Sequence, residues 1–418
     1  MSAATGNSKG GLIGWIDARF PLTRMWNEHV GEYYAPKNFN FWYYFGSLAI
    51  FVLVNQILTG IWLTMNYTPD ADLAFSSVEY IMRDVQWGWL IRYLHSTGAS
   101  MFFAVVYLHM FRALLYGSYK KPRELLWVFG MLIYLVLMAE AFMGYLLPWG
   151  QMSFWGAKVI TSLFGAIPVV GPDLVQWIRG DFTISGVTLN RFFALHVIAL
   201  PLVLLLLVVA HILALHEVGS NNPDGVDIKK NKDANGLPKD GIRFHPYYTT
   251  KDLVGLVVFL IVFLSIVFFA PTFGGLFLEK PNFQPADPLQ TPEHIAPVWY
   301  FTAFYSILRS IPDKLTGVIA MGAAIFVLFF LPWIDRGQVR SIRYRGLGYK
   351  IALFTFAANF IFLSYLGVKP PSMMILGLEA SLWAFYAMLL YFGYFAFLFI
   401  YTAFGLERTK PVPERVTD

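Results

Sequence analysis

The most constraining feature of this chain is a series of long apolar segments. Hydrophobic residues make up 57% of its 418 residues and charged residues only 14%, whereas an ordinary soluble domain is about 25% charged. A helix needs about 20 apolar residues to cross a bilayer. None of the segments alternates as barrel strands do, so we predict an all-α, polytopic membrane protein. Its eight transmembrane helices are expected at 41–65, 98–116, 125–147, 192–215, 253–270, 315–334, 350–367 and 376–404.

Basic residues predict the orientation of these helices. If the N-terminus is cytoplasmic, the two terminal segments and the connections on their side carry most of the 31 Lys and Arg residues. The positive-inside rule therefore places both termini in the cytoplasm. This asymmetry accounts for the net charge of +5, so the charge calls for no nucleic-acid partner.

The apolar pattern also predicts how the chain is divided. A cytoplasmic N-terminal segment is followed by a bundle of four helices, a polar loop, four more helices and a cytoplasmic tail. Residues 12–30 suit a helix lying in the membrane interface, although a solvated lead-in fits nearly as well. The expected boundaries are 1–40, 41–216, 217–250, 251–405 and 406–418.

Four of the eight histidines lie in two of the predicted helices. His95 and His109 are 14 residues apart, so at about 100° per residue they point from one helix face. His196 and His211 are 15 residues apart, which leaves the second about 60° past four turns. A kink at Pro201 would return this pair to a common face. Each pair spans about 21 Å along its helix, most of the hydrocarbon thickness.

Matched histidines at two membrane depths predict two stacked metal centres. Ionisable residues inside a membrane are functional by default. We predict two haems, one between His95 and His196 and the other between His109 and His211. Two axial nitrogens leave no position for dioxygen, so such iron would carry electrons. The chain has no cysteine, which excludes iron–sulfur ligation and thioether-attached haem.

Two glycine pairs repeat the 14-residue interval. Gly46 and Gly60 lie in the first predicted helix, and Gly130 and Gly144 in the third. Their missing side chains would leave room for the edges of a flat macrocycle. Close packing of helices through small residues is the alternative, and either pair alone would favour it.

Three arginines lie near the expected haem levels. Arg92, Arg112 and Arg191 stand close in sequence to His95, His109 and His196, near helix ends where haem propionates would emerge. Arginine pairs well with carboxylates through two parallel hydrogen bonds. The competing interpretation is that these side chains extend to the membrane interface.

Several sequence strings carry a resemblance to a known family. They are "GYLLPWGQMSFWGAKVITSL", "LNRFFALH", "LHEVGSNNPDG" and "FHPYYTTKDLVG". With the histidines and glycines, they resemble cytochrome b, the core subunit of quinol–cytochrome c oxidoreductase, from about residue 15 to residue 405. The 15-residue histidine interval and the polar loop look like proteobacterial versions, which implies the inner membrane of a bacterium.

The resemblance assigns the metal ligands and two quinone sites. It implies a low-potential b-type haem on His95 and His196 near the positive side of the membrane, and a high-potential haem on His109 and His211 near the negative side. For quinol oxidation at the positive side, the matching residues are Tyr145, Gly156, Pro297, Trp299, Tyr300 and Tyr305. For quinone reduction at the negative side, they are His216, Lys251 and Asp252. Without the resemblance, this last group would read equally well as a helix cap with surface charges.

One position departs from the family pattern. The usual Pro-Glu-Trp-Tyr motif is "PVWY" here, with Val298 in place of the glutamate. Valine cannot accept a proton, so another group must take the proton from quinol. The candidates are Glu293, His294, Tyr145 and the propionate near Arg92.

The resemblance also implies a mechanism and partners. A quinol, with ubiquinol as the expected species, gives one electron to a Rieske-type iron–sulfur protein. The other electron passes through the low-potential and then the high-potential haem to quinone at the negative side, coupled to proton translocation. A cytochrome c-type subunit and a homodimer of the complex are implied as well.

Two other classes of function remain open from the residues alone. In a secondary transporter the intramembrane histidines would form a proton relay, but the two histidine helices carry no carboxylate beside them. A dihaem membrane anchor of a dehydrogenase would share the haem spectrum but lack the positive-side quinol site. The plastid relatives are disfavoured because they attach an extra haem through a cysteine.

Overall fold

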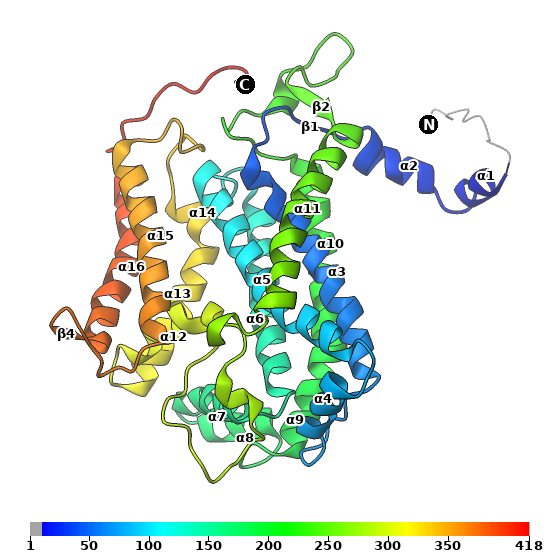
Figure 1. Ribbon diagram of the computed structural model, residues 1–418. Helices are drawn as coiled ribbons and strands as arrows, with labels where there is room; N and C mark the ends of the chain where they lie inside the picture. The colour runs from blue at the N-terminus through cyan, green and yellow to red at the C-terminus, as the bar shows by residue number, and fades with distance from the viewer. Residues whose placement is uncertain (1–10, 418) are drawn as a thin grey trace.

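The computed structural model describes residues 11–417 and is predominantly helical (Figure 1). Within these residues, seven helical segments are long and apolar enough to cross a membrane. They are η2 (Phe41–Tyr43) with α3 (Tyr44–Thr64), α5 (Gly88–Tyr116), α6 (Glu124–Leu146), α9 (Gly186–Ala194) continued by η4 (Leu195–Ala199) and α10 (Leu200–Val218), α11 (Phe244–Phe269), α15 (Leu347–Gly367) and α16 (Ala380–Ala403).

The eighth predicted helix is shorter than the others. α13 (Lys314–Phe329) has 16 residues and is followed by α14 (Leu331–Ile334). Pro332 lies in the first turn of α14, where its missing N–H costs nothing, so the chain restarts a helix there instead of continuing α13. Together the two helices cover the predicted segment 315–334.

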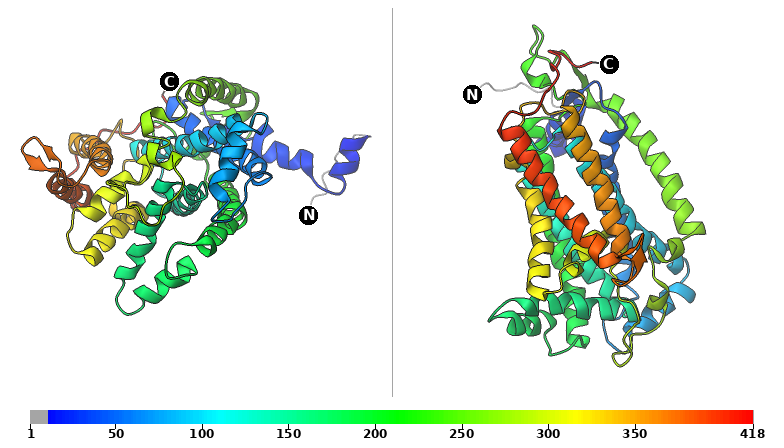
Figure 2. Two further views of the ribbon diagram at one scale, coloured as in Figure 1. Left: turned by 60° about the horizontal axis from the view of Figure 1, so that its bottom comes forward. Right: turned by 90° about the vertical axis from the view of Figure 1, so that its left-hand side faces the viewer.

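The long helices form two groups (Figures 1 and 2). In the first, α3 packs on α5, α6 packs on α10, and α11 packs on α5 and α3. In the second, α15 packs on α16, and α12 (Thr302–Arg309) packs against both α13 and α15. The first group is the expected four-helix bundle, with α11 added to its side.

Short elements cover the two ends of the molecule. One end holds α4 (Ala74–Arg83), α7 (Gln151–Leu163), η3 (Phe164–Ala166) and α8 (Gly171–Arg179), with the connection that contains η6 (Phe273–Gly275), η7 (Lys280–Phe283) and η8 (Trp299–Phe301), and the hairpin of β3 (Met374–Ile375) and β4 (Leu378–Glu379) (Figure 1). At the other end, β1 (Tyr34–Pro36) pairs antiparallel with β2 (Gly241–Arg243), close to η5 (Ile228–Lys230). The described parts of both terminal segments also lie at this second end (Figure 1).

The predicted interfacial helix over 12–30 is not one helix. The structure has α1 (Leu12–Asp17), α2 (Leu22–Trp26) and the π-helical turn η1 (Asn27–Gly31) instead. Pro21, directly before α2, has no N–H to continue α1, so the segment breaks there. Residues 1–10 of the expected N-terminal segment lie outside the described residues.

Other helices begin earlier than their apolar runs. α5 starts at Gly88, whereas the apolar run predicted residue 98, because Arg92 and His95 lower the hydropathy of its first turns. Large side chains on the outer faces remain exposed, among them Leu206 of α10 and Ile261 of α11. In a protein with seven membrane-capable helices, such faces suit contact with lipid.

Candidate functional site

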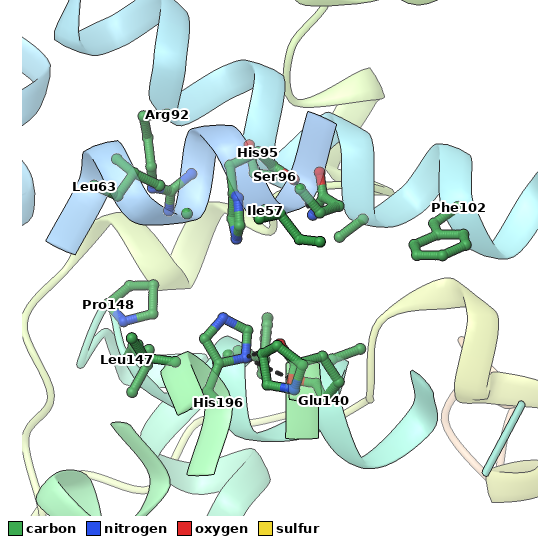
Figure 3. Close-up of a pocket in the computed structure, with 18 of the residues that line it drawn as sticks. Ile57, Leu63, Arg92, His95, Ser96, Phe102, Glu140, Leu147, Pro148 and His196 are labelled. Carbon is green, nitrogen blue, oxygen red and sulfur yellow. Dashed lines mark hydrogen bonds and ion pairs between the residues drawn. The ribbon is translucent and has the colours of Figure 1, made fainter. Parts of the chain in front are cut away.

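The structure brings the four intramembrane histidines together in two pairs across the bundle. The ring centroids of His95 and His196 are 6.2 Å apart, and those of His109 and His211 are 6.4 Å apart. A metal that binds two imidazole nitrogens from opposite sides at about 2 Å each holds the ring centroids about 6 Å apart. Figure 3 shows His95 and His196 pointing toward each other from facing helices. Both pairs therefore have the separation that a shared iron requires.

A π-helical turn corrects the unequal histidine spacing. The residues Leu195–Ala199 follow the π pattern, in which each turn contains one residue more than in an α-helix. His196 lies in this turn, so the 15-residue interval to His211 presents the same face as the 14-residue interval on α5. The sequence predicted a realignment near Pro201, and the structure places it in the turn just before that proline.

Each of the four glycines lies against one histidine ring. A Cβ built on Gly60, Gly46 or Gly130 would lie 3.3, 3.4 or 3.4 Å from Cε1 of His95, His109 or His211, respectively. A Cβ on Gly144 would lie only 2.4 Å from Cε1 of His196. The glycines thus stand at the two histidine levels, as their interval predicted. The space left by their missing side chains is next to the imidazole ring.

We call the pair His95 and His196 the first level and the pair His109 and His211 the second level. The rings of the first level are held by hydrogen bonds at Nδ1. Nδ1 of His95 is 2.9 Å from Oγ1 of Thr59. Nδ1 of His196 is 2.9 Å from the carbonyl oxygen of Glu140 and 3.1 Å from its carboxylate. These bonds at Nδ1 leave Nε2 as the nitrogen available to a metal.

Thr59 and Glu140 were missed from the sequence. Glu140 is the one carboxylate within the segment 125–147, which is a signal that could have found it. Its Oε2 is buried without a hydrogen-bond partner among the described residues. Thr59 gives no such signal, since a threonine in an apolar helix is ordinary.

The three arginines occupy different environments. Arg92 lines the cavity beside His95 and His196 (Figure 3). Nη2 of Arg112 lies 3.3 Å from Nδ1 of His109, while its buried Nε finds no acceptor among the described residues. A buried N–H without an acceptor could donate to a carboxylate such as a haem propionate.

Arg191 differs from the other two arginines. Its Nη1 donates to the carbonyl oxygen of Trp177 on α8, and its side chain is exposed. The lining of the cavity contains Arg92 but not Arg191. The guanidinium of Arg191 thus already has a protein acceptor, whereas Arg92 borders the cavity and Arg112 has a buried N–H without one among the described residues.

One cavity joins the first histidine level to the predicted quinol site. It has a volume of about 450 Å³ and lies between α3, α5, α6, α10 and the connection from α11 to α12. Besides the histidines it is lined by Tyr145, Val298 and Tyr300. Residues predicted for haem binding and for quinol oxidation thus face the same space, which is apolar except for a few polar groups.

The other residues predicted at the positive side are placed differently. The hydroxyl of Tyr305 donates to the carbonyl oxygen of Ile295, 3.1 Å away. His294 Nε2 lies 3.2 Å from the carbonyl oxygen of Val368, and the Glu293 side chain is exposed. Neither Glu293 nor His294 lines the cavity.

Glu279, a carboxylate that was not singled out from the sequence, is bonded to a residue of the cavity wall and does not line the cavity itself. The hydroxyl of Tyr145 donates a hydrogen bond of 2.8 Å to Oε2 of Glu279, in the connection after α11. Burial raises the pKa of Glu279 to about 7, and the Tyr145 hydrogen bond offsets part of that rise. The sequence signal is a lone acidic residue at the end of the apolar string "GGLFLE".

The residues predicted at the negative side do not all line the same cavity. His216 lines a second cavity, of about 510 Å³, with His29 and Tyr33. Its Nε2 lies 3.3 Å from the carbonyl oxygen of His29, and its ring centroid is 4.7 Å from that of Tyr33.

The other two predicted residues of this side lie on α11. The Lys251 ammonium lies over the ring of Tyr247, 4.7 Å from its centroid, and the carboxylate of Asp252 is hydrogen-bonded to Ser47. The second cavity is lined by His216 but not by Lys251 or Asp252. The contribution of His29 and Tyr33 could not be read from the sequence, because it depends on how the N-terminal segment folds back over α10.

Comparisons with known proteins agree with this arrangement. Residues 30–219 match the family described as Cytochrome b/b6/petB, and residues 285–392 match Cytochrome b(C-terminal)/b6/petD. The chain belongs to the cytochrome b family. A cytochrome b of Allochromatium vinosum is 61% identical over 97% of this chain and 98% of its own length. A cytochrome b of Rhodospirillum rubrum is 50% identical over 96% of this chain and 95% of its own.

A solved structure shares the fold. A chain of a hyperthermophilic respiratory complex III superposes with a TM-score of 0.86 at 37% identity, covering 94% of this chain and 99% of that one. Haem, transmembrane helices and respiratory electron transport follow from membership of the cytochrome b family. The secondary-transporter alternative is thereby removed.

Proposed function

We propose that this cytochrome b is the dihaem subunit of a quinol–cytochrome c oxidoreductase. The observation that carries the proposal is the pair of facing imidazoles at each of two levels of one bundle, 6.2 and 6.4 Å apart. The cavity that joins the first level to Tyr145 and Tyr300 supplies the place where a quinol would be oxidised.

In this proposal each histidine pair binds one b-type haem. His95 and His196 hold the low-potential haem, and His109 and His211 hold the high-potential haem. Bound haem supplies one-electron transfer between the two faces of the membrane. The protein sets the direction of the ligands: Thr59 and the Glu140 carbonyl fix the tautomers of His95 and His196, so that Nε2 faces the gap.

Glycines and arginines complete each haem site. Gly60 and Gly144 let the ligands of the first level approach the bundle wall, as Gly46 and Gly130 do at the second. Arg92 at the first level and Arg112 at the second are the proposed partners of the propionates. Each guanidinium stays charged, so it compensates a carboxylate that would otherwise be costly in the membrane.

Quinol oxidation is proposed at the end that carries α7 and α8. Tyr145, Tyr300 and Val298 line the cavity there, and Tyr305 holds the adjoining backbone through Ile295. The ring of Tyr300 stacks on Phe103, with centroids 4.0 Å apart, which fixes its orientation toward the cavity. These side chains would exclude water and orient the quinol ring.

Quinone reduction is proposed at the opposite end. His216 borders the second cavity and is the proposed proton donor there, because an imidazole N–H can form a hydrogen bond to a quinone oxygen and pass a proton to it. Lys251 and Asp252, on the first turns of α11, are proposed to supply protons from the aqueous side. The reduced quinone would carry these protons across the membrane to the first site.

The proposed function also implies a location and partners for the chain. We propose that the chain lies in the inner membrane of a bacterium with both termini in the cytoplasm. A Rieske-type iron–sulfur protein, a cytochrome c-type subunit and a second copy of the complex are its proposed partners. Ubiquinol is the proposed substrate.

The test uses the complete complex in sealed liposomes. We expect ubiquinol to reduce added cytochrome c, with protons released on the outside. A reduced-minus-oxidised spectrum should show b-type bands before any turnover. A complex that contains both haems yet fails to oxidise quinol would contradict the proposal and favour a dihaem anchor.

A further inference from the structure

The lining of the quinol cavity has no carboxylate at position 298, although quinol oxidation must release two protons. Val298 is buried in the cavity wall and cannot accept a proton. Glu293 is exposed, and His294 faces the carbonyl of Val368, so neither reaches this space. The proton acceptor must therefore come from another part of the chain.

Glu279 is placed to fill this role. Glu279 is not itself among the residues that line the cavity, but its neighbour Leu278, the nearby Asn282 and Tyr145 are. The hydroxyl of Tyr145 donates to the Glu279 carboxylate, which neither Glu293 nor His294 matches, within the described residues, with a bond to the cavity wall. The side chain of Glu279 is partly exposed, so it also has a route to water. A carboxylate that is bonded to the cavity wall on one side and partly solvated on the other can take a proton from one and pass it to the other.

We propose that Glu279 is the proton acceptor for quinol oxidation in this chain, in place of a carboxylate at position 298. The role rests on the proposed function of the cavity. One proton and one electron of the quinol leave with the iron–sulfur partner. The haem that His95 and His196 would hold would take the second electron of the quinol. The remaining O–H bond of the quinol breaks, an O–H bond forms on Glu279, and quinone results. The protonated carboxyl then releases its proton to water at the same face.

Tyr145 has a positioning role in this proposal. Its hydroxyl already donates to Glu279, so it orients the carboxylate and favours its ionised form. Tyr300 is a second titratable group close enough to interact with Glu279, and the side chain of the next residue, Lys280, is exposed. A pKa of about 7 leaves a large fraction of Glu279 ionised at neutral pH and ready to accept a proton.

The experiment measures the rate of haem reduction by ubiquinol, per haem, in the purified complex with the quinone-reducing site blocked. In the wild type, we expect the rate to rise with pH and to level off above about 7. Glu279→Gln should lower the rate by about 100-fold or more and abolish this rise. The matched control is Asp287→Asn, an exposed carboxylate of the same connection, which should behave as wild type.

Two further variants separate chemistry from folding. Tyr145→Phe removes the hydrogen bond that favours the ionised carboxylate, so the inflection should move to higher pH. Val298→Glu in the Glu279→Gln background returns a carboxylate to the cavity wall and should restore much of the rate. If Glu279→Gln does not assemble, Tyr145→Phe decides alone: an unmoved inflection contradicts the proposal.

The outcomes distinguish this inference from the function on which it rests. A wild-type complex that does not oxidise quinol would contradict the proposed function, and the role of Glu279 with it. An active wild type with an equally active Glu279→Gln variant, unchanged in its pH profile, would contradict the role of Glu279 alone.

Discussion

At the scale of single residues, the closest approach of a glycine to a ligand histidine is that of Gly144 to His196. A Cβ at Gly144 would lie 2.4 Å from the imidazole, whereas one at Gly130 would lie at an ordinary 3.4 Å from His211. We therefore expect Gly144→Ala to displace the ring and remove most of the haem at the first level. Gly130→Ala should keep both haems. The absorbance of each haem in the purified complex, relative to protein, measures the difference; equal haem content in the two variants would contradict the proposed ligand geometry.

Residues differ in how far the sequence reveals them. The histidines and glycines could be paired from the sequence because their spacing repeats along separate helices, and Arg92 was singled out because it lies three residues before His95. Glu279 and Thr59 could not, because each acts through a partner far away in the sequence, Tyr145 and His95 respectively. Arg191 could not be assigned from the sequence either, because its hydrogen bond to the carbonyl oxygen of Trp177 depends on how α8 packs beside α9.

At the scale of elements, the π-helical turn Leu195–Ala199 sets the register of α10. Pro201 has no N–H, so the carbonyl group of Val197 lacks its usual helical partner and the turn widens. Pro201→Ala should allow a regular α-helix, which rotates His196 away from the face of His211 and lowers haem occupancy at the first level. Deleting Ile198 in that variant restores a 14-residue interval and should recover both haems. Haem content after purification checks both results; no loss in Pro201→Ala would show that the turn does not depend on the proline.

Element types were easier to predict than element boundaries. Long apolar runs indicated the membrane helices, but the helices extend past those runs at the ends where charged residues begin, as α5 does with Arg92. The break of the N-terminal segment at Pro21 and the restart at Pro332 both follow from the missing proline N–H. A hydropathy pattern alone does not predict either break.

At the scale of the whole molecule, a buried ion cluster ties the two groups of helices together. The Asp335 carboxylate, after α14, pairs with Lys120, after α5, and with Arg345, before α15, at 2.8 Å each. Arg345 also pairs with Glu407 of the tail at 2.6 Å. The pairs of Lys120 with Asp335 and of Arg345 with Glu407 were not predictable, because each joins segments that are distant in sequence.

This cluster predicts a pH-dependent part of the stability. Burial opposes ionisation of Asp335, but Lys120 and Arg345 outweigh it and hold its pKa below the usual value. A lowered pKa contributes stability that is complete above about pH 4, the value for an unfolded Asp, and is lost as the pH falls below it. Asp335→Asn should destabilise the protein by about 3–5 kcal/mol at neutral pH, because the buried Lys120 loses its carboxylate partner and Arg345 loses one of its two.

Thermal unfolding of the detergent-solubilised complex between pH 3 and pH 7 checks this prediction. The midpoints of wild type and Asp335→Asn should differ most at neutral pH and converge in acid. The exposed Glu414→Gln, at the same end of the molecule, should follow the wild type throughout. A constant difference at all pH values would mean that Asp335 acts through packing and not through its charge.

The central claim is that two metal centres lie between α5 and α10, each held by one histidine from each helix. A redox titration of the purified complex at the b-haem absorption band tests it most directly. We predict two waves in the wild type, and in His211→Leu the loss of the high-potential wave with the low-potential wave retained. Two unchanged waves in His211→Leu, or a single wave in the wild type, would contradict the claim.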